Sequence, residues 1–208
     1  MRIQTQSEEK WNAITHGIGA VLGVVCLILL ILKDTHKTEY SLLSVIIYGL
    51  SIIILFTAST TYHAIKNGKY KHTFRVIDHI SIYLLIAGTY TPVLLISLEQ
   101  SLGWILFAVV WGIAAFGVVL KIFFTGKFNV FSTLLYLVMG WLIVFDFSNL
   151  KTIMPTEGIT LLTLGGAAYT IGIIFYTLEK KSFFHVIWHL FVLTGAICHF
   201  FMVYLYVV

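Results

Sequence analysis

The sequence predicts an all-α integral membrane protein, built as a bundle of seven transmembrane helices. Hydrophobic residues make up 59% of the 208 residues and charged residues only 11%, whereas a soluble domain carries about 25% charged residues. The charged residues are also grouped between long apolar runs. No ten-residue segments alternate between polar and apolar residues, so helices are favoured over a transmembrane barrel.

The apolar runs are seven, and each has close to the roughly 20 residues that a transmembrane helix needs. The first run follows a polar head that contains Glu8 and Glu9 but no small-residue cleavage signal, so we expect it to be retained as a helix. The separators, in order, are "KDTHKTEY", "KNGKYKHTF", "SLEQS", "KIFFTGKFN", "DFSNLKTIMPTEG" and "EKKS". None is long enough for a second domain, so residues 1–208 form one membrane domain. Its helices are expected at about 13–32, 41–65, 75–97, 102–124, 129–147, 159–178 and 183–207.

The lysine and arginine residues predict how the bundle is oriented. Ten of them fall in the N-terminal head and in the segments after the second, fourth and sixth runs, against three on the other side. Positively charged loops stay in the cytoplasm, so the N-terminus is expected inside and the C-terminus outside. This asymmetry also accounts for the pI of about 9.0 without a nucleic-acid partner.

Four ionisable residues lie near the predicted cytoplasmic ends of three different runs. His63 precedes Lys66 by three residues, and Asp78 follows Arg75 by three. His185 and His189, at the start of the last run, come four and eight residues after Lys181, and they share one helix face. We therefore expect these four side chains to converge at one membrane depth. Ser59 lies one turn from His63 on the same face.

Three imidazoles at one depth indicate a metal site, because neutral histidine suits zinc and three protein ligands leave one position for water. A proton relay through the histidines and Asp78 is the alternative. The HxxxH spacing of His185 and His189 lacks the glutamate of soluble HExxH proteases, a role that Asp78 could take. His199 lies about 15 Å further along the last helix, so we expect it to serve packing.

These residues resemble those of the hemolysin III family of bacteria, the prokaryotic branch of the progestin and adipoQ receptor (PAQR) superfamily. The matching segments are "EEKWNAITHGIGA", "STTYH", "DHISIYLLIAGTYTP" and "HVIWHLFVLTGAICHF". The resemblance implies a multi-pass protein of the bacterial cell (inner) membrane with its N-terminus inside. It also implies that His63, His185 and His189 bind zinc, that Asp78 contacts the zinc-bound water, and that Ser59 is the family's serine.

The wider superfamily includes alkaline ceramidases and is thought to contain membrane-embedded, metal-dependent amide hydrolases. The resemblance therefore implies a zinc-dependent hydrolase of lipid amide or ester bonds, with membrane lipids as partners and substrate. Asp78 would act as general base and then as acid, while Ser59 would hydrogen-bond a developing oxyanion or Asp78. The alternatives are a pore-forming, haemolytic protein and a receptor-like sensor with structural zinc. The sequence predicts no oligomeric state.

Overall fold

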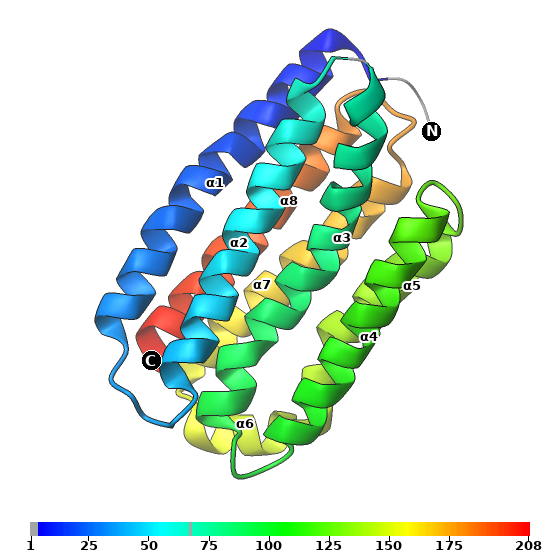
Figure 1. Ribbon diagram of the computed structural model, residues 1–208. Coiled ribbons are helices and arrows are strands. Elements are labelled where there is room, and N and C mark those ends of the chain that lie inside the picture. The colour runs from blue at the N-terminus through cyan, green and yellow to red at the C-terminus, as the bar shows by residue number, and fades with distance from the viewer. Residues whose placement is uncertain (1–3, 67) are drawn as a thin grey trace.

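The computed structural model of the protein describes residues 4–66 and 68–208 (Figure 1). This part of the chain contains helices and no strand, and seven of its helical stretches are long and apolar enough to cross a membrane. The predicted fold class is therefore confirmed. The helices are α1 (Gln6–Lys33), α2 (Ser41–Ala64), α3 (Lys69–Pro92), α4 (Gly103–Phe124), α5 (Asn129–Trp141), α6 (Phe147–Ile153), α7 (Thr156–Thr177) and α8 (Phe184–Tyr206).

Two of the crossings are composite. The third consists of α3 followed by a π-helical turn, Val93–Ser97, directly after Pro92. The fifth consists of α5, a 3-10 turn at Leu142–Asp146, and α6. Because the number of crossings is odd, the two termini lie at opposite ends of the bundle (Figure 1). The orientation of the bundle in the membrane, with the N-terminus in the cytoplasm, stays a prediction from the distribution of lysine and arginine.

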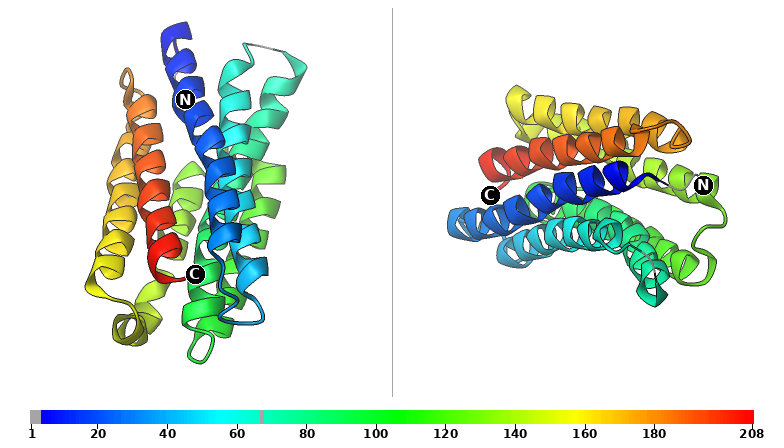
Figure 2. Two further views of the ribbon diagram at one scale, coloured as in Figure 1. Left: turned by 90° about the vertical axis from the view of Figure 1, so that its left-hand side faces the viewer. Right: turned by 90° about the horizontal axis from the view of Figure 1, so that it is seen from above.

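The helices form a closed ring of neighbours (Figure 2). Helix α1 packs against α2 and α8, α2 packs against α3, and α3 packs against both α4 and α5. Helix α7 then lies between α5 and α8 and completes the ring. This order places the beginnings of α1, α3 and α8 next to the end of α2. These four segments carry the polar residues of the candidate site.

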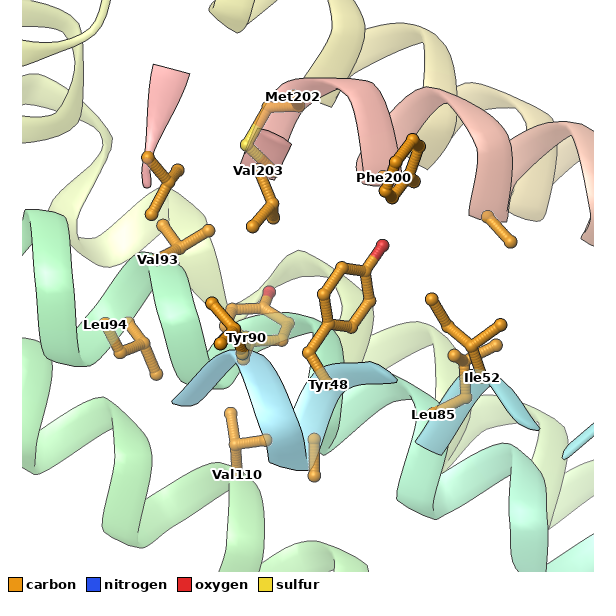
Figure 3. Packing of buried hydrophobic residues seen from close by; sticks show 14 of the residues in the cluster. Tyr48, Ile52, Leu85, Tyr90, Val93, Leu94, Val110, Phe200, Met202 and Val203 are labelled. Carbon is orange, nitrogen blue, oxygen red and sulfur yellow. The ribbon is translucent and has the colours of Figure 1, made fainter. Parts of the chain in front are cut away.

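The apolar core lies between the helices, and Figure 3 shows the part of it around Tyr48. Tyr48 of α2 lies at its centre and is fully buried, as are Leu94, Met202 and Val203 around it. The outer surface is apolar as well, with Phe123 71% and Val130 75% exposed. Such side chains are suited to contact with lipid. The core and the outer surface of the bundle are therefore both apolar.

Three predicted boundaries differ from the structure by five residues or more. Helix α3 begins at Lys69, whereas the third crossing was expected from residue 75. Helix α1 begins at Gln6, not near residue 13, because Thr5 and Glu8 form a capping box that satisfies the first free amides of the helix. The fifth crossing continues to Ile153 instead of ending at residue 147. The buried Asp146 is tolerated inside it because its carboxylate accepts hydrogen bonds from Ser101 and from the Leu102 amide.

Close packing of α1 on α2 predicts different outcomes for two glycines. A methyl group on Gly49 would meet Leu27, with its Cδ1 at 2.5 Å and its backbone Cα at 3.1 Å, whereas one on Gly112 would have no neighbour within 4 Å. We expect Gly49→Ala to lower the free energy of unfolding by about 1–3 kcal/mol. Gly112→Ala should leave it unchanged or raise it by up to about 1 kcal/mol. Thermal unfolding in detergent measures both, and an equal shift in the two variants would contradict this packing.

Candidate metal centre

Three histidine side chains from two helices meet near the end of the bundle that carries the N-terminus. His63 lies in the last turn of α2, and His185 and His189 lie in the first two turns of α8. Each offers a ring nitrogen, and these three atoms lie within 4.8 Å of one another. His63 and His189 are buried, at 3% and 2% exposure, and His185 is partly buried. The convergence predicted from helix depth and spacing is therefore present.

An oxygen atom faces the Nδ1 atom of each of these histidines. His63 Nδ1 lies 2.5 Å from Glu9 Oε2, and His189 Nδ1 lies 3.3 Å from the Asn12 carbonyl oxygen. His185 Nδ1 lies 3.4 Å from Glu179 Oε2, an ion-pair distance that exceeds a well-formed hydrogen bond. A carbonyl or carboxylate oxygen accepts a proton from the ring, so these contacts favour the tautomer that leaves the Nε2 lone pair free in His63 and His189. His185 Nδ1 has no hydrogen-bond partner among the described residues.

The Glu9 carboxylate is itself held by a second partner. Its other oxygen lies 3.1 Å from Lys71 Nζ, and this ammonium group also donates to the Tyr62 carbonyl at 2.8 Å. The ammonium further lies 4.3 Å from the centre of the Tyr62 ring. With both oxygens engaged, the carboxylate has one orientation in which it accepts the His63 proton. A partner of this type fixes the orientation of a ligand and raises its basicity.

The neighbouring Glu8 joins the start of α1 to the start of α8. Its Oε2 accepts the Thr5 amide at 2.8 Å and completes the cap of α1, while its Oε1 accepts the Phe183 amide at 2.7 Å. Phe183 has a left-handed backbone conformation (φ 62°) and directly precedes α8. The two adjacent carboxylates therefore connect α1 to both helices that carry the three histidines.

His16 of α1 packs on the centre without joining it. Its ring stacks on His189, with centroids 3.6 Å apart and planes inclined by 11°, and meets the edge of Phe56 at 4.9 Å. Both ring nitrogens of His16 are buried and have no hydrogen-bond partner among the described residues. We infer that His16 holds the His189 ring in position. His199, by contrast, lies against Gly165 and near the Leu162 carbonyl, away from the cluster.

Asp78 and Ser59 form a pair beside the three histidines. Ser59 is buried and Asp78 is partly buried, and the Ser59 hydroxyl and His185 are both close enough to the Asp78 carboxylate to act on it. Ser59 and His63 lie one turn apart on α2, and Asp78 lies in the third turn of α3. The structure thus brings together all five residues that the sequence singled out. The catalytic roles of Asp78 and Ser59 stay predictions.

The donor set fits a zinc ion. Three neutral imidazoles are a common catalytic zinc ligand set, and their second nitrogens are ordinarily bound by carboxylates or carbonyls, as they are here. The Nε2 atom of His63 is buried and has no hydrogen-bond partner in the described part of the chain. An orphaned lone pair of this kind is costly, and a cation at the meeting point of the three rings would satisfy it.

Sequence reasoning missed Glu9, Glu179 and the Asn12 carbonyl, which hold the three rings. Glu9 was assigned to a polar head outside the first helix. The T-x-x-E pattern at Thr5–Glu8 was the signal that could have placed it inside, one turn from Asn12. Glu179 lies in the turn before α8, and no sequence pattern points from it to His185.

Comparisons with known proteins agree with this architecture. Residues 4–200 match the family described as "Haemolysin-III related". The chain is 46% identical to "Hemolysin-3" of Bacillus cereus, over 98% of this chain and 94% of that protein. It is 44% identical to "Hemolysin-3 homolog" of Bacillus subtilis (strain 168), over 98% and 96%.

A human protein is related as well. The "Monocyte to macrophage differentiation factor" of Homo sapiens is 32% identical over 77% of this chain and 68% of its own length. A family match over nearly the whole chain, together with seven membrane-length helices, leads to one conclusion. The chain belongs to the hemolysin III family of multi-pass membrane proteins.

Proposed function

We propose that His63, His185 and His189 hold a zinc ion and that the protein hydrolyses an amide or ester bond of a membrane lipid. The observation that carries the proposal is the arrangement of the three imidazoles. Each Nδ1 faces an oxygen outside the cluster, and the three ligand atoms lie within 4.8 Å of one another. The Asp78–Ser59 pair beside them supplies the acid-base group that a hydrolase needs.

The same arrangement favours a metal over a proton relay. A relay needs neighbouring rings that alternate as donor and acceptor, so that a proton can pass from one to the next. Here the donating nitrogens of His63 and His189 are turned outward to Glu9 and to the Asn12 carbonyl. What remains between the rings is a set of lone pairs, and lone pairs repel one another unless a cation lies between them.

The residues around the centre divide the chemistry between them. Bound zinc would supply a Lewis acid that makes water a nucleophile near neutral pH and polarises the substrate carbonyl. Asp78 would take the proton of the attacking water as general base and return it to the leaving amine or alcohol. The Ser59 hydroxyl, beside that carboxylate, would orient it by a hydrogen bond. Glu9 and Lys71 keep His63 in the tautomer that presents Nε2.

A lipid substrate is supported by the surroundings of the centre. A small apolar groove of about 20 Å³ lies between α1, α2 and α8, lined by Gly19, Leu22, Gly23, Cys26, Ile52, Phe56, Leu193, Ala196, Ile197 and Phe200. Phe56 also touches His16, which stacks on His189, so the groove begins beside the centre. The groove is too small for an acyl chain in this structure, so what it offers a lipid substrate is an apolar lining beside the histidines.

A haemolytic pore is the second candidate, because the Bacillus cereus relative is called "Hemolysin-3". The bundle interior argues against a preformed channel. Fully buried side chains, among them Tyr48, Leu94 and Met202, pack between the helices. A third candidate is a sensor in which zinc is structural. Structural zinc sites have four protein ligands, whereas the metal-binding group found among the described residues has three.

Metal content tests the centre itself. We expect the purified wild-type protein to contain close to one zinc per chain, and His189→Ala to lose it, because a chelate of three ligands is reduced to two. His199→Ala is the matched control, since it removes another buried histidine of the same helix outside the cluster. Elemental analysis measures all three. Equal zinc in the wild type and in His189→Ala would contradict the site.

The Glu9 contact predicts a graded effect. Glu9→Gln keeps the size of the side chain but removes its charge, so it should weaken zinc binding by about 10–100-fold. Glu157→Gln removes an exposed glutamate from α7 and should leave the affinity unchanged. Competition with a chromogenic chelator gives both constants. An unchanged affinity in Glu9→Gln would show that this carboxylate does not support the ligand.

Turnover tests the role of Asp78 separately from the metal. Asp78→Asn should keep the zinc but lower hydrolysis of a ceramide or of a short-chain lipid ester by about 10²–10⁴-fold, because the general base is gone. The assay uses wild-type and variant protein in liposomes loaded with a fluorescent dye, so that the same vesicles report leakage. The hydrolase proposal would be contradicted if the zinc-loaded wild type hydrolysed neither substrate and the vesicles still leaked with His189→Ala. That result would favour a pore.

A further inference from the structure

A second polar cluster lies at the same end of the bundle, between α3, α4 and α5. Its centre is Lys121, in the last turn of α4, which is only 1% exposed. By sequence this lysine counts as a loop residue. No ion pair of residues 4–66 and 68–208 involves it. A buried ammonium group without a counter-charge is strongly unfavourable, so an anion is expected beside it.

The helix geometry shows which residues face Lys121. The Tyr83 ring of α3 lies against Gly117 of α4, so closely that a methyl group there would be 2.3 Å from the ring. The two helices run in opposite directions (Figure 1). Lys121 comes one turn after Gly117 on α4, and His79 comes one turn before Tyr83 on α3. Lys121 therefore lies opposite His79. His79 and Lys121 act on each other electrostatically, as do Lys121 and Arg75.

Arg75 lies one further turn along the same face of α3. A Cβ atom on Gly126, in the loop after α4, would lie 3.6 Å from one of its guanidinium nitrogens. Arg75, His79 and Tyr83 thus follow one another at four-residue intervals and face the end of α4. Arg75 and the Asp78 carboxylate act on each other electrostatically, whereas no acidic group acts on Lys121 in this way. Lys121 is therefore the cation of this cluster that lacks a counter-charge.

Unpartnered polar groups surround Lys121 and Arg75. His79 is 6% exposed, and its Nδ1 atom has no hydrogen-bond partner in the described part of the chain. The same is true of Ser132 Oγ on α5, where the residue is 1% exposed. Helix α5 packs directly on this region, since the Tyr136 hydroxyl donates to the His79 carbonyl at 3.1 Å. Ser132 lies one turn before Tyr136, on the same face.

We propose that Lys121, Arg75, His79 and Ser132 form a binding site for a phosphate oxyanion, supplied by the headgroup of a phospholipid. A phosphate accepts charge-assisted hydrogen bonds from ammonium and guanidinium groups and ordinary ones from an imidazole N–H and a hydroxyl. Basic pockets between transmembrane helices bind anionic headgroups in this way. The site uses none of the three histidines of the metal centre and does not depend on the proposed hydrolysis.

A lipid is favoured over free phosphate by what lies next to the site. Phe123, Phe124 and Phe128 follow Lys121 and are 71%, 43% and 60% exposed. Exposed phenylalanine rings are suited to contact with the hydrocarbon of acyl chains, because they have no polar group to hydrate. A phospholipid with its phosphate on Lys121 could lay its chains against these rings, whereas inorganic phosphate would leave them uncovered.

Lipid retained by the purified protein tests the site. Native mass spectrometry after purification in mild detergent should show bound phosphatidylglycerol on the wild type and about tenfold less on Lys121→Met. Lys121→Arg should retain it. The matched control is Lys127→Met, which removes an exposed lysine six residues away. Equal retention by Lys121→Met and Lys127→Met would overturn the proposal.

A second measurement uses only the wild type, in case Lys121→Met does not fold. Delipidated protein is unfolded thermally in nanodiscs of phosphatidylcholine with or without phosphatidylglycerol, and in detergent with phosphate or with chloride at equal ionic strength. A higher midpoint with phosphatidylglycerol alone assigns the site to the lipid headgroup. A matching rise with inorganic phosphate assigns it to free phosphate. No rise in either arm overturns the site.

Discussion

A polar group inside a membrane bundle must find its partner within the protein, because lipid offers none. This constraint explains where the polar residues of the chain lie. His63, His185 and His189 meet at one end of the bundle, and the protein satisfies one nitrogen of His63 and of His189 and brings a carboxylate near that of His185. Each of the three rings also offers one ligand atom, and these atoms lie within 4.8 Å of one another. One cation between the three rings would act as partner to all three imidazoles. The need for partners inside the bundle therefore favours a metal site at this position.

Helix α1 contributes more to this centre than its position suggests. Much of its length faces lipid, with Val21 and Leu32 largely exposed. Its first turn nevertheless joins the two helices that carry the histidines, since Glu8 accepts the Phe183 amide before α8 and Glu9 accepts the His63 proton on α2. The capping box at Thr5 sets where this turn begins. The beginning of the helix and the geometry of the centre are therefore determined by the same residues.

The sequence predicted the fold and the three histidines because both depend on simple periodicities. Apolar runs of membrane length mark the crossings, and the i, i+4 spacing puts His185 and His189 on one face. It did not predict Glu9, because a count of apolar residues ends the first helix where the polar ones begin, although the helix continues through them. It also treated Lys121 as a loop cation. Helices that are apolar on all sides carry little signal of which face points inward, so the burial of Lys121 depends on packing that only the structure shows.

X-ray absorption at the zinc edge of the purified protein measures the atoms that surround the proposed metal ion most directly. We predict three imidazole nitrogens and one lighter oxygen ligand at about 2.0–2.1 Å, with the outer-shell scattering that imidazole rings produce. Sulfur at about 2.3 Å, four imidazoles, or zinc surrounded only by water and carboxylate oxygen would contradict the centre described for His63, His185 and His189.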